Sequence, residues 1–512
     1  MTALPRVCVI GAGSSGIAVI KALQDRGIPV VCFEKGDDIG GNWCYRNSNG
    51  MSAAYESLHI NTDARLMEYR DYPMPPQTPD YPGHRVIKAY FDDYAEKFGL
   101  RRHIRFGCSV ERARRAGDGR WDIELEDGTS ERFDALVVAN GHHWDPRWPE
   151  PAYPGEFHGQ QIHSHAYLNP REPVDFHGKR VLVVGMGNSA MDIACELSRP
   201  GIADRLFLSA RHGVWVLPKY LFGLPMSRLG LLPHWVPWQV GSLLTRLAVG
   251  IVAGTPWRFG LPRPDHRMLQ AHPTISQEIY LRLGSGDVLP RPGIRCLKGD
   301  RVEFSDGTEE AVDVIVWCTG YKLSLPFFDP EFIAAPGNDL PLWERMIRPG
   351  IDNLFFVGLL QPLGAIMPIA EAQGRFIGDY LLGRVALPEV AAMERAMESE
   401  RKAMFRRYRD RAPRHTMQVD FAAYLHRLRQ HARRGDVIII GGIDETGVLF
   451  DLRMIFHGFA GCGREIEPDP GYRRIFAGGG AAGGFFLCAA RHAGNFLIKK
   501  CINGIVTYEN GL

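Results

Sequence analysis

Short apolar runs, each followed by a glycine-rich turn and a helical pattern, recur along the chain. The first run covers residues 6–10 and ends at Gly11, and a helical pattern over residues 17–23 stops near Gly27. A second apolar run follows at residues 30–33. Apolar runs without polar alternation are typical of strands that are buried on both faces of a parallel sheet. The pattern therefore predicts a strand–helix–strand unit at the start of the chain.

The same order of elements returns 174 residues later. An apolar run at residues 179–184 ends at Gly185, a helix is expected to begin near Asn188, and a further apolar run covers residues 205–208. Alternating strands and helices are typical of α/β proteins with parallel sheets. The chain is therefore expected to contain two such units.

The turn of the first unit has the spacing of a dinucleotide-binding fingerprint, Gly11-Ala-Gly13-Ser-Ser-Gly16. Glycines at these positions permit a tight turn and let the backbone approach a pyrophosphate at the N-terminus of the helix. Glu34 ends the second strand, 23 residues after Gly11. A carboxylate there can accept hydrogen bonds from the ribose hydroxyls of an adenosine. The first unit is thus predicted to bind an adenine dinucleotide.

The second turn reads Gly185-Met-Gly187-Asn188-Ser189-Ala190, and the strand after its helix ends in Ser209-Ala-Arg211 without an acidic residue. A carboxylate would repel a 2′-phosphate, whereas arginine can bind it through charge-assisted hydrogen bonds and serine can add a donor. The second unit is therefore predicted to prefer NADPH. An Arg211 that is only a surface residue remains the alternative.

Composition narrows the class of protein. The 512 residues are 45% hydrophobic and 23% charged, and the formal net charge of +2 gives no indication of nucleic-acid binding. The ten cysteines contain no C-x-x-C pair, which argues against a disulfide reductase and against a zinc site. Single cysteines and a first apolar run that reads as a strand rather than a signal peptide predict a cytoplasmic protein.

Between the two fingerprints lie Phe157, Gly159, His163 and Tyr167 in the spacing F-x-G-x-x-x-H-x-x-x-Y. This pattern resembles the signature of the flavin-containing monooxygenases, although Leu168 stands where that family usually has lysine or arginine. The related Baeyer–Villiger monooxygenases usually carry tryptophan at the position of Tyr167. Further similarity extends over about residues 4–430, so the chain resembles the first group more closely.

The resemblance implies that FAD occupies the first site and NADPH the second. In that family NADPH reduces FAD, and dioxygen then adds at flavin C4a to give a hydroperoxide. An asparagine beside the flavin ring corresponds to Asn61, whose amide can orient its neighbours without titrating; an ordinary turn residue is the alternative. The other residues that the resemblance assigns to cofactor binding are Gly41, Trp43, Thr62, Thr319, Gly320 and Gln361. His163 is expected to fix the linker between the domains rather than to transfer protons.

The activity expected from this resemblance is transfer of one oxygen atom from dioxygen to a nucleophilic nitrogen or sulfur, such as that of an amine or sulfide. Baeyer–Villiger oxygenation of ketones, an uncoupled NADPH oxidase and a non-catalytic dinucleotide sensor remain as alternatives. The oxidant forms on the cofactor, so the protein needs no nucleophile and no acid–base pair.

The implied fold is α/β, with two interleaved Rossmann-like domains of the three-layer β/β/α type and a C-terminal extension. Residues 1–150 and 325–434 form the FAD domain, residues 151–169 the linker, and residues 170–324 the NADPH domain. An insertion at about residues 216–275 is expected to line a substrate channel, with buried core or weak contact with a membrane surface as alternatives; its apolar stretch of about 14 residues is too short to span a bilayer. Residues 435–512 are left as a packed extension or an oligomer contact, such as that of a homodimer.

Overall fold

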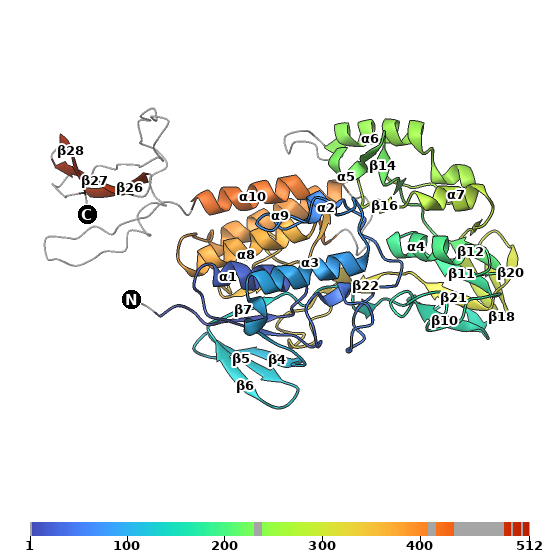
Figure 1. Ribbon diagram of the computed structural model, residues 1–512, viewed down its shortest axis with the longest axis horizontal. Helices are drawn as coiled ribbons and strands as arrows, with labels where there is room; N and C mark the ends of the chain where they lie inside the picture. Colours follow the sequence, from blue (N-terminus) through green and yellow to red (C-terminus); the bar gives the residue numbers. More distant parts are fainter. Residues whose placement is uncertain are drawn as a thin grey trace. The chain divides into compact units, whose positions relative to one another are not determined.

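The computed structural model describes residues 3–229, 238–407, 416–434, 486–492, 495–502 and 505–510. The chain divides into two compact units (Figure 1). One comprises Met1–Leu382 and Leu387–Arg429, and the other Gly383–Ala386 and Gln430–Leu512. Both dinucleotide-binding folds lie in the first unit.

The first fold is built on a parallel sheet of five strands in the order β23-β7-β1-β2-β3. Its strands are β1 (Val7–Ile10), β2 (Val30–Phe33), β3 (Ile104–Arg105), β7 (Ala135–Val138) and β23 (Leu354–Phe356). Because β23 comes from a distant part of the chain, the chain leaves this fold and returns to it. The interleaving expected from the sequence is thereby confirmed.

Helices cover one face of this sheet and a small antiparallel sheet covers the other (Figure 1). Helix α1 (Ser14–Gln24) packs against α8 (Met367–Leu381). The antiparallel strands are β4 (Val110–Arg115), β5 (Trp121–Leu125) and β6 (Ser130–Phe133). Cys8 and Ile10 of β1 share a buried cluster with Trp121 and Phe133 of this meander. This is the three-layer β/β/α arrangement.

The second fold repeats the three layers on a parallel sheet in the order β10-β21-β11-β12-β17. Its strands are β10 (Gln160–His163), β11 (Arg180–Val184), β12 (Arg205–Ser209), β17 (Leu289–Arg291) and β21 (Val314–Trp317). Val181 and Val183 pack toward α4 (Asn188–Leu197), whereas Leu182 and Val184 join the cluster on the opposite face. That face carries the sheet β9 (Gly155–Phe157), β18 (Ile294–Gly299), β19 (Arg301–Phe304) and β20 (Glu309–Ala311).

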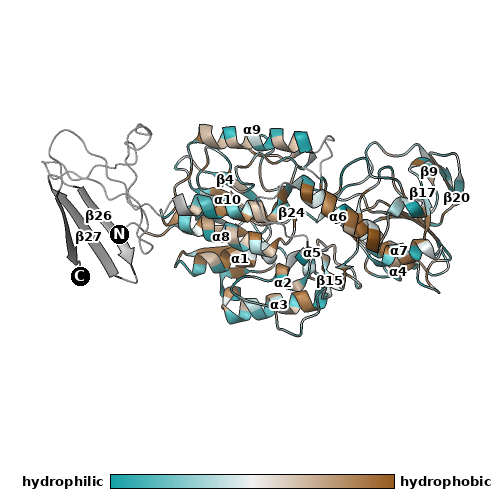
Figure 2. Ribbon diagram, turned by 90° about the horizontal axis from the view of Figure 1, so that it is seen from above, coloured by the Kyte–Doolittle hydropathy of each residue, from teal (hydrophilic) through white to brown (hydrophobic). Residues whose placement is uncertain are grey.

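The insertion in the second fold presents an apolar surface. It contains β13 (Val216–Leu217), β14 (Tyr220–Leu221), β15 (Leu224–Pro225), α5 (Met226–Leu229), α6 (Trp238–Val252), η3 (Pro256–Phe259) and β16 (Thr274–Ile275), and α7 (Glu278–Gly284) follows it. Val249 packs inward, while Leu243, Leu247 and Ile251 are exposed, Ile251 by 80%. Figure 2 shows the brown face of α6.

The helix of the apolar segment, α6, has 15 residues, close to the stretch of about 14 residues expected from the sequence. Trp238–Phe259 is long and apolar enough to cross a membrane when judged by length and composition alone, and 22% of its most apolar window is buried. That range joins α6 to the turn η3. The helix itself ends at Val252, before Gly254 at φ +75° and the separate turn η3.

The remaining elements connect these folds. They are η1 (Gly41–Trp43), α2 (Ala64–Met67), α3 (His84–Lys97), η2 (Leu100–His103), β8 (Asp145–Pro146), β22 (Tyr321–Lys322), η4 (Pro336–Asn338), β24 (Gln361–Leu363), α9 (Val390–Arg407), β25 (Gln418–Asp420) and α10 (Phe421–Arg434). In the second unit, β26 (Phe486–His492), β27 (Asn495–Ile502) and β28 (Ile505–Asn510) form an antiparallel sheet. Residues 435–485, including the glycine-rich stretches, lie outside the described residues. Three points stay predictions: the role of residues 435–512, the exact domain boundaries and the cytoplasmic location.

Candidate functional site

The first glycine turn places three glycines in different surroundings. Gly11 has φ +96°, and a Cβ added there would lie 2.8 Å from the carbonyl oxygen of Ala139. A Cβ on Gly16 would lie 1.9 Å from the carbonyl oxygen of Gly11. At Gly13 the nearest atom to an added Cβ is the Cα of Gly41, at 3.8 Å. The protein's own packing thus requires Gly11 and Gly16, whereas a Cβ on Gly13 would make only ordinary van der Waals contact.

Glu34 organises this turn from the end of β2. Its Oε2 accepts a hydrogen bond from the backbone N–H of Ala12 at 2.6 Å, and its Oε1 accepts one from Gly36 at 2.7 Å. The side chain is buried, at 8% exposed, yet it lines the main cavity. Each carboxylate oxygen can accept a second hydrogen bond, so Glu34 can still receive hydroxyl donors.

The second glycine turn has the same design. Gly185 has φ +133°, and its Cβ would lie 2.5 Å from the carbonyl oxygen of Cys318, whereas a Cβ on Gly187 would meet nothing within 4 Å. Asn188 begins α4, and its Oδ1 accepts a hydrogen bond from the backbone N–H of Ile275 at 2.9 Å. Gly187, Asn188 and Ser189 line the cavity.

At the end of β12, Ser209 and Arg211 differ in whether their side chains are available to bind a phosphate. Ser209 is buried, and its hydroxyl donates to the carbonyl oxygen of Pro292 at 2.6 Å. Its proton is therefore engaged, contrary to the expectation that it would be free for a phosphate. Arg211 is exposed, and no ion pair holds its guanidinium within the described part of the chain. Arg211 alone is positioned as a free cation.

Both turns open on one cleft with a volume of about 660 Å³. The predicted site residues that line it are Gly11, Gly13, Glu34, Gly41, Trp43, Asn61, Gly187, Asn188, Ser189, Gly320 and Gln361. Gly16, Thr62, Gly185, Ser209, Arg211 and Thr319 lie outside its lining. Gly16 and Gly185 pack against backbone atoms of the protein itself. The Thr319 hydroxyl donates to the carbonyl oxygen of Arg147. The structure therefore brings most of the predicted residues together around a single space.

Asn61 lies on the loop before α2 and faces the cleft, with Thr62 Oγ1 at 3.5 Å from its Oδ1. The next residue, Asp63, is fully buried and caps α2 by accepting the backbone N–H of Arg65 at 3.1 Å. Its ion pair with Arg228 was not foreseen from the sequence. The helix-capping pattern was the available signal, but the partner lies 165 residues away.

The signature residues fasten the linker to α4. The Tyr167 hydroxyl donates to Glu196 Oε2 at 2.8 Å, and the Tyr55 hydroxyl donates to Asp192 Oδ2 at 2.6 Å. Burial raises the pKa of Asp192 to about 6. A Cβ on Gly159 would lie 2.4 Å from the carbonyl oxygen of Asp313, which explains the need for glycine there.

Burial favours the neutral form of His142, His143 and His163 by lowering their pKa values. His142 and His143 line the cleft, and burial lowers the pKa of His143 to about 4. His163 is 3% exposed, its ring packs against Trp148 and Tyr321, and burial lowers its pKa to about 4 as well. Neutral rings of this kind supply few protons at pH 7. The packing of His163 fits a role in fixing the linker.

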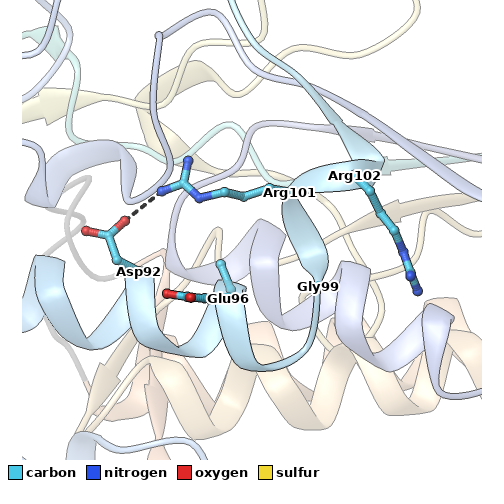
Figure 3. Close-up of a pocket in the computed structure, with 6 residues that line it drawn as sticks. Asp92, Glu96, Gly99, Arg101 and Arg102 are labelled. Atoms are coloured by element: carbon cyan, nitrogen blue, oxygen red, sulfur yellow. Dashed lines mark hydrogen bonds and ion pairs between the residues drawn. The ribbon is translucent and has the colours of Figure 1, made fainter.

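A second hollow, of about 450 Å³, lies between α3 and η2 (Figure 3). Arg101 pairs with Asp92 at 2.8 Å, and Figure 3 shows Glu96 and Arg102 pointing apart. None of its lining residues belongs to the cleft. This hollow has no buried polar group among its lining residues and lacks a turn with the spacing of a dinucleotide fingerprint, so the cleft is the better candidate for a cofactor site.

Comparison with known proteins identifies the family. The model of the family described as "Flavin-binding monooxygenase-like" matches residues 4–440. Flavin-containing monooxygenase 5 of Rattus norvegicus is 35% identical over 436 residues, which cover 81% of this chain and 80% of the relative. Dimethylaniline monooxygenase [N-oxide-forming] 2 of the same species is 34% identical over 418 residues, 76% of this chain and 75% of the relative.

Solved structures share the fold. S-allyl-L-cysteine S-oxygenase from Allium sativum superimposes with a TM-score of 0.62 at 25% identity, covering 84% of this chain and 88% of the other. Cyclohexanone monooxygenase from Rhodococcus sp. Phi1, bound to NADP⁺, gives a TM-score of 0.63 at 18% identity, covering 85% of this chain and 98% of the other. The second likeness concerns the fold alone.

The residues of the cleft fit two dinucleotides. Gly13 and Gly187 leave open backbone at the N-termini of α1 and α4, where a pyrophosphate would be bound. Asn140 lines the cleft with a buried Oδ1 that has no hydrogen-bond partner in the part of the chain that the structure describes. Arg211, outside the lining of the cleft, is an exposed cation without an ion-pair partner among the described residues. The chain therefore belongs to the flavin-binding monooxygenase-like family, and its cofactors are FAD and NADPH.

Proposed function

We propose that this monooxygenase transfers one oxygen atom from dioxygen to a nucleophilic nitrogen or sulfur of a small organic substrate, with NADPH as the reductant. The observation that carries the proposal is the single cleft on which both glycine turns open. The printed names of two similar proteins support the choice of atom, since one is N-oxide-forming and the other is an S-oxygenase.

When bound, FAD accepts a hydride from NADPH and activates dioxygen, and this chemistry belongs to the cofactors. The chain supplies the binding surfaces. The open backbone at Gly13 and the N-terminus of α1 would hold the FAD pyrophosphate, and Gly187 with α4 would hold that of NADPH. Arg211 is the residue that would bind the 2′-phosphate.

Asn61 and His143 are two polar groups of the cleft that can orient bound molecules without changing charge near pH 7. Asn61 offers an amide that donates and accepts hydrogen bonds at every pH of interest. His143 has a pKa of about 4 because it is buried, so its ring is neutral at pH 7. An amide and a neutral imidazole can position cofactor and substrate while releasing few protons into the site. These properties suit an oxidant that must survive until the substrate arrives.

The test is a product analysis with isotopically labelled dioxygen. The flavin-loaded enzyme receives NADPH and, separately, a tertiary amine, a thioether and a cyclic ketone. We expect an N-oxide and a sulfoxide that each carry one labelled oxygen atom. A labelled lactone as the main product would replace this proposal with Baeyer–Villiger oxygenation. Hydrogen peroxide without any labelled product would leave an NADPH oxidase.

The role of Asn61 is tested by Asn61→Leu. If the amide orients the groups in the cleft, the variant should bind FAD and oxidise NADPH, yet release more hydrogen peroxide and less product. One oriented hydrogen bond contributes about 1–1.5 kcal/mol, or roughly a tenfold change in the ratio of peroxide to product. An unchanged ratio in a folded, flavin-loaded variant would make Asn61 an ordinary turn residue.

A further inference from the structure

The loop that carries Asn61 is fastened to the insertion of the other dinucleotide fold through a buried carboxylate. Asp63 is 0% exposed, its Oδ2 accepts the hydroxyl of Ser227 at 2.8 Å, and its Oδ1 accepts Nε of Arg228 at 2.9 Å. Its backbone N–H also donates to Ser227 Oγ at 3.1 Å. The two short helices involved, α2 and α5, lie side by side (Figure 1, Figure 2).

Arg228 holds two segments of the FAD fold at once. Its second nitrogen donates to Asp80 Oδ1 at 2.8 Å, and Asp80 accepts the backbone N–H of Ala64 through its carbonyl oxygen at 2.8 Å. Nearby, the Tyr81 hydroxyl donates to the carbonyl oxygen of Lys219 at 2.6 Å. The insertion is thereby joined to both sides of the loop that bears Asn61.

No other cation replaces Arg228 at this carboxylate within the described residues. Arg65, although close in sequence, donates through its guanidinium to the carbonyl oxygens of Met74, Pro75 and Pro76. A carboxylate that is buried without its partner is costly, because desolvation is no longer offset. Removing Arg228 would therefore leave Asp63 to move toward water, and Asn61 would move with it.

The contact joins the two walls of the cleft. Asn61 lines the cleft from the FAD fold, and Lys219 lines it from the insertion in the NADPH fold. Seven residues separate Lys219 from Ser227, and Met226 donates its N–H to the carbonyl oxygen of Lys219 at 2.9 Å. A change at Asp63 or Arg228 would shift one wall relative to the other.

We propose that Asp63 and Arg228 are positioning residues that set the distance between Asn61 and the NADPH side of the cleft. This inference rests on the proposed function, because it assigns Asn61 a place in the oxygenation site. Its consequence is that breaking the Asp63–Arg228 ion pair uncouples NADPH oxidation from oxygen transfer, while both cofactors still bind.

The experiment compares Arg228→Gln, Arg228→Lys and the control Arg246→Gln in the full-length holoenzyme. Arg246 is an exposed arginine of α6, outside the lining of the cleft. Flavin content and the melting temperature are measured first, so that the comparison uses folded, loaded enzyme. The readouts are hydrogen peroxide per NADPH oxidised with a tertiary amine, and the rate of NADPH oxidation without substrate.

Arg228→Gln should raise the ratio of peroxide to product and the substrate-free rate at least about tenfold, because it removes two charged hydrogen bonds and one alone accounts for about that factor. Arg228→Lys should restore part of the coupling, since it keeps a cation for Asp63 but cannot reach both carboxylates through a planar fork. Arg246→Gln should match the wild type. If Arg228→Gln loses stability or flavin, Arg228→Lys is used for the test instead. Its ratio of peroxide to product should lie between the value of the wild type and the value expected for Arg228→Gln.

Wild-type coupling and wild-type substrate-free rate in both Arg228 variants would overturn the inference. If the wild-type enzyme forms no N-oxide or sulfoxide, the proposed function fails instead, and the substrate-free rate still reports on the ion pair. A melting temperature that falls while both kinetic readouts stay unchanged would make the contact purely structural and would also overturn the inference.

Discussion

Gly13→Ala separates binding of FAD from stability of the fold. Gly13 has φ −69°, which any residue adopts, and the nearest atom to an added Cβ is 3.8 Å away. The protein without cofactor therefore has room for the methyl group. The same methyl group would occupy the cleft where the FAD pyrophosphate approaches the backbone.

The size of the effect follows from the contacts that the methyl group displaces. Hydrogen bonds to a charged phosphate contribute about 1.5–3 kcal/mol each, so losing one weakens FAD binding roughly ten- to 150-fold. At a free FAD concentration of 1,000 times Kd, the cofactor stabilises the fold by about 4.1 kcal/mol. A hundredfold weaker site at the same concentration retains about 1.4 kcal/mol. The expected loss of about 2.7 kcal/mol appears only when FAD is present.

The assay is urea unfolding of wild type and Gly13→Ala, each with and without FAD, together with a fluorescence titration of FAD into the apoprotein. Gly16→Ala is the matched control, because its Cβ would lie 1.9 Å from the carbonyl oxygen of Gly11. The control should be destabilised already without FAD, since its backbone must shift to accept the methyl group.

Two results would refute this reasoning. An apoprotein of Gly13→Ala as unstable as that of Gly16→Ala would show that Gly13 has no free space. Unchanged FAD affinity in Gly13→Ala would show that the cofactor does not approach the backbone at this turn.

Three further predictions address other parts of the chain. Arg211→Ala should raise KM for NADPH about ten- to a hundredfold and leave KM for NADH unchanged, and an unaltered NADPH/NADH ratio would contradict the assignment of Arg211. Burial lowers the pKa of His163 from 6.5 to about 4, so the unfolded chain binds more protons between these values and stability should fall as pH drops from 6.5 to 4. The urea midpoint of His163→Asn should depend less on pH than that of the wild type, and an equal dependence would contradict this prediction. The exposed face of α6 leads us to expect co-sedimentation with anionic lipid vesicles that Leu247→Glu abolishes without moving the urea midpoint, and no binding by the wild type would refute it.

The elements around the glycine turns could be predicted because their signals are local. The strands at residues 30–33 and 205–208 and the helix start at Asn188 agree with β2, β12 and α4 to within a residue. Their buried faces and glycine turns leave a periodic trace in the sequence. The placement of Gly11, Gly13 and Glu34 around one turn follows from the same local geometry.

Contacts between distant segments could not be predicted in this way. The Ser209 hydroxyl is engaged by Pro292, a residue of a different loop, and Asp63 is paired with Arg228. A polar residue in a turn has the same local pattern whether its partner is water, a cofactor or a side chain far along the chain. Only the three-dimensional arrangement distinguishes these cases.

Local glycine turns and long-range contacts are expected to serve different steps of the reaction. The glycine turns let the backbone approach the two dinucleotides, and each turn packs closely against the end of a neighbouring strand, Gly11 against Ala139 and Gly185 against Cys318. Whether bound cofactors deliver oxygen to a substrate or lose it as peroxide depends on how the two walls of the cleft meet. Those walls are held by long-range polar contacts, Tyr55 to Asp192 on one side and Asp63 to Arg228 on the other. Substitutions at these contacts should therefore change coupling with little effect on cofactor binding, and a substitution such as Gly13→Ala should weaken cofactor binding with little effect on coupling.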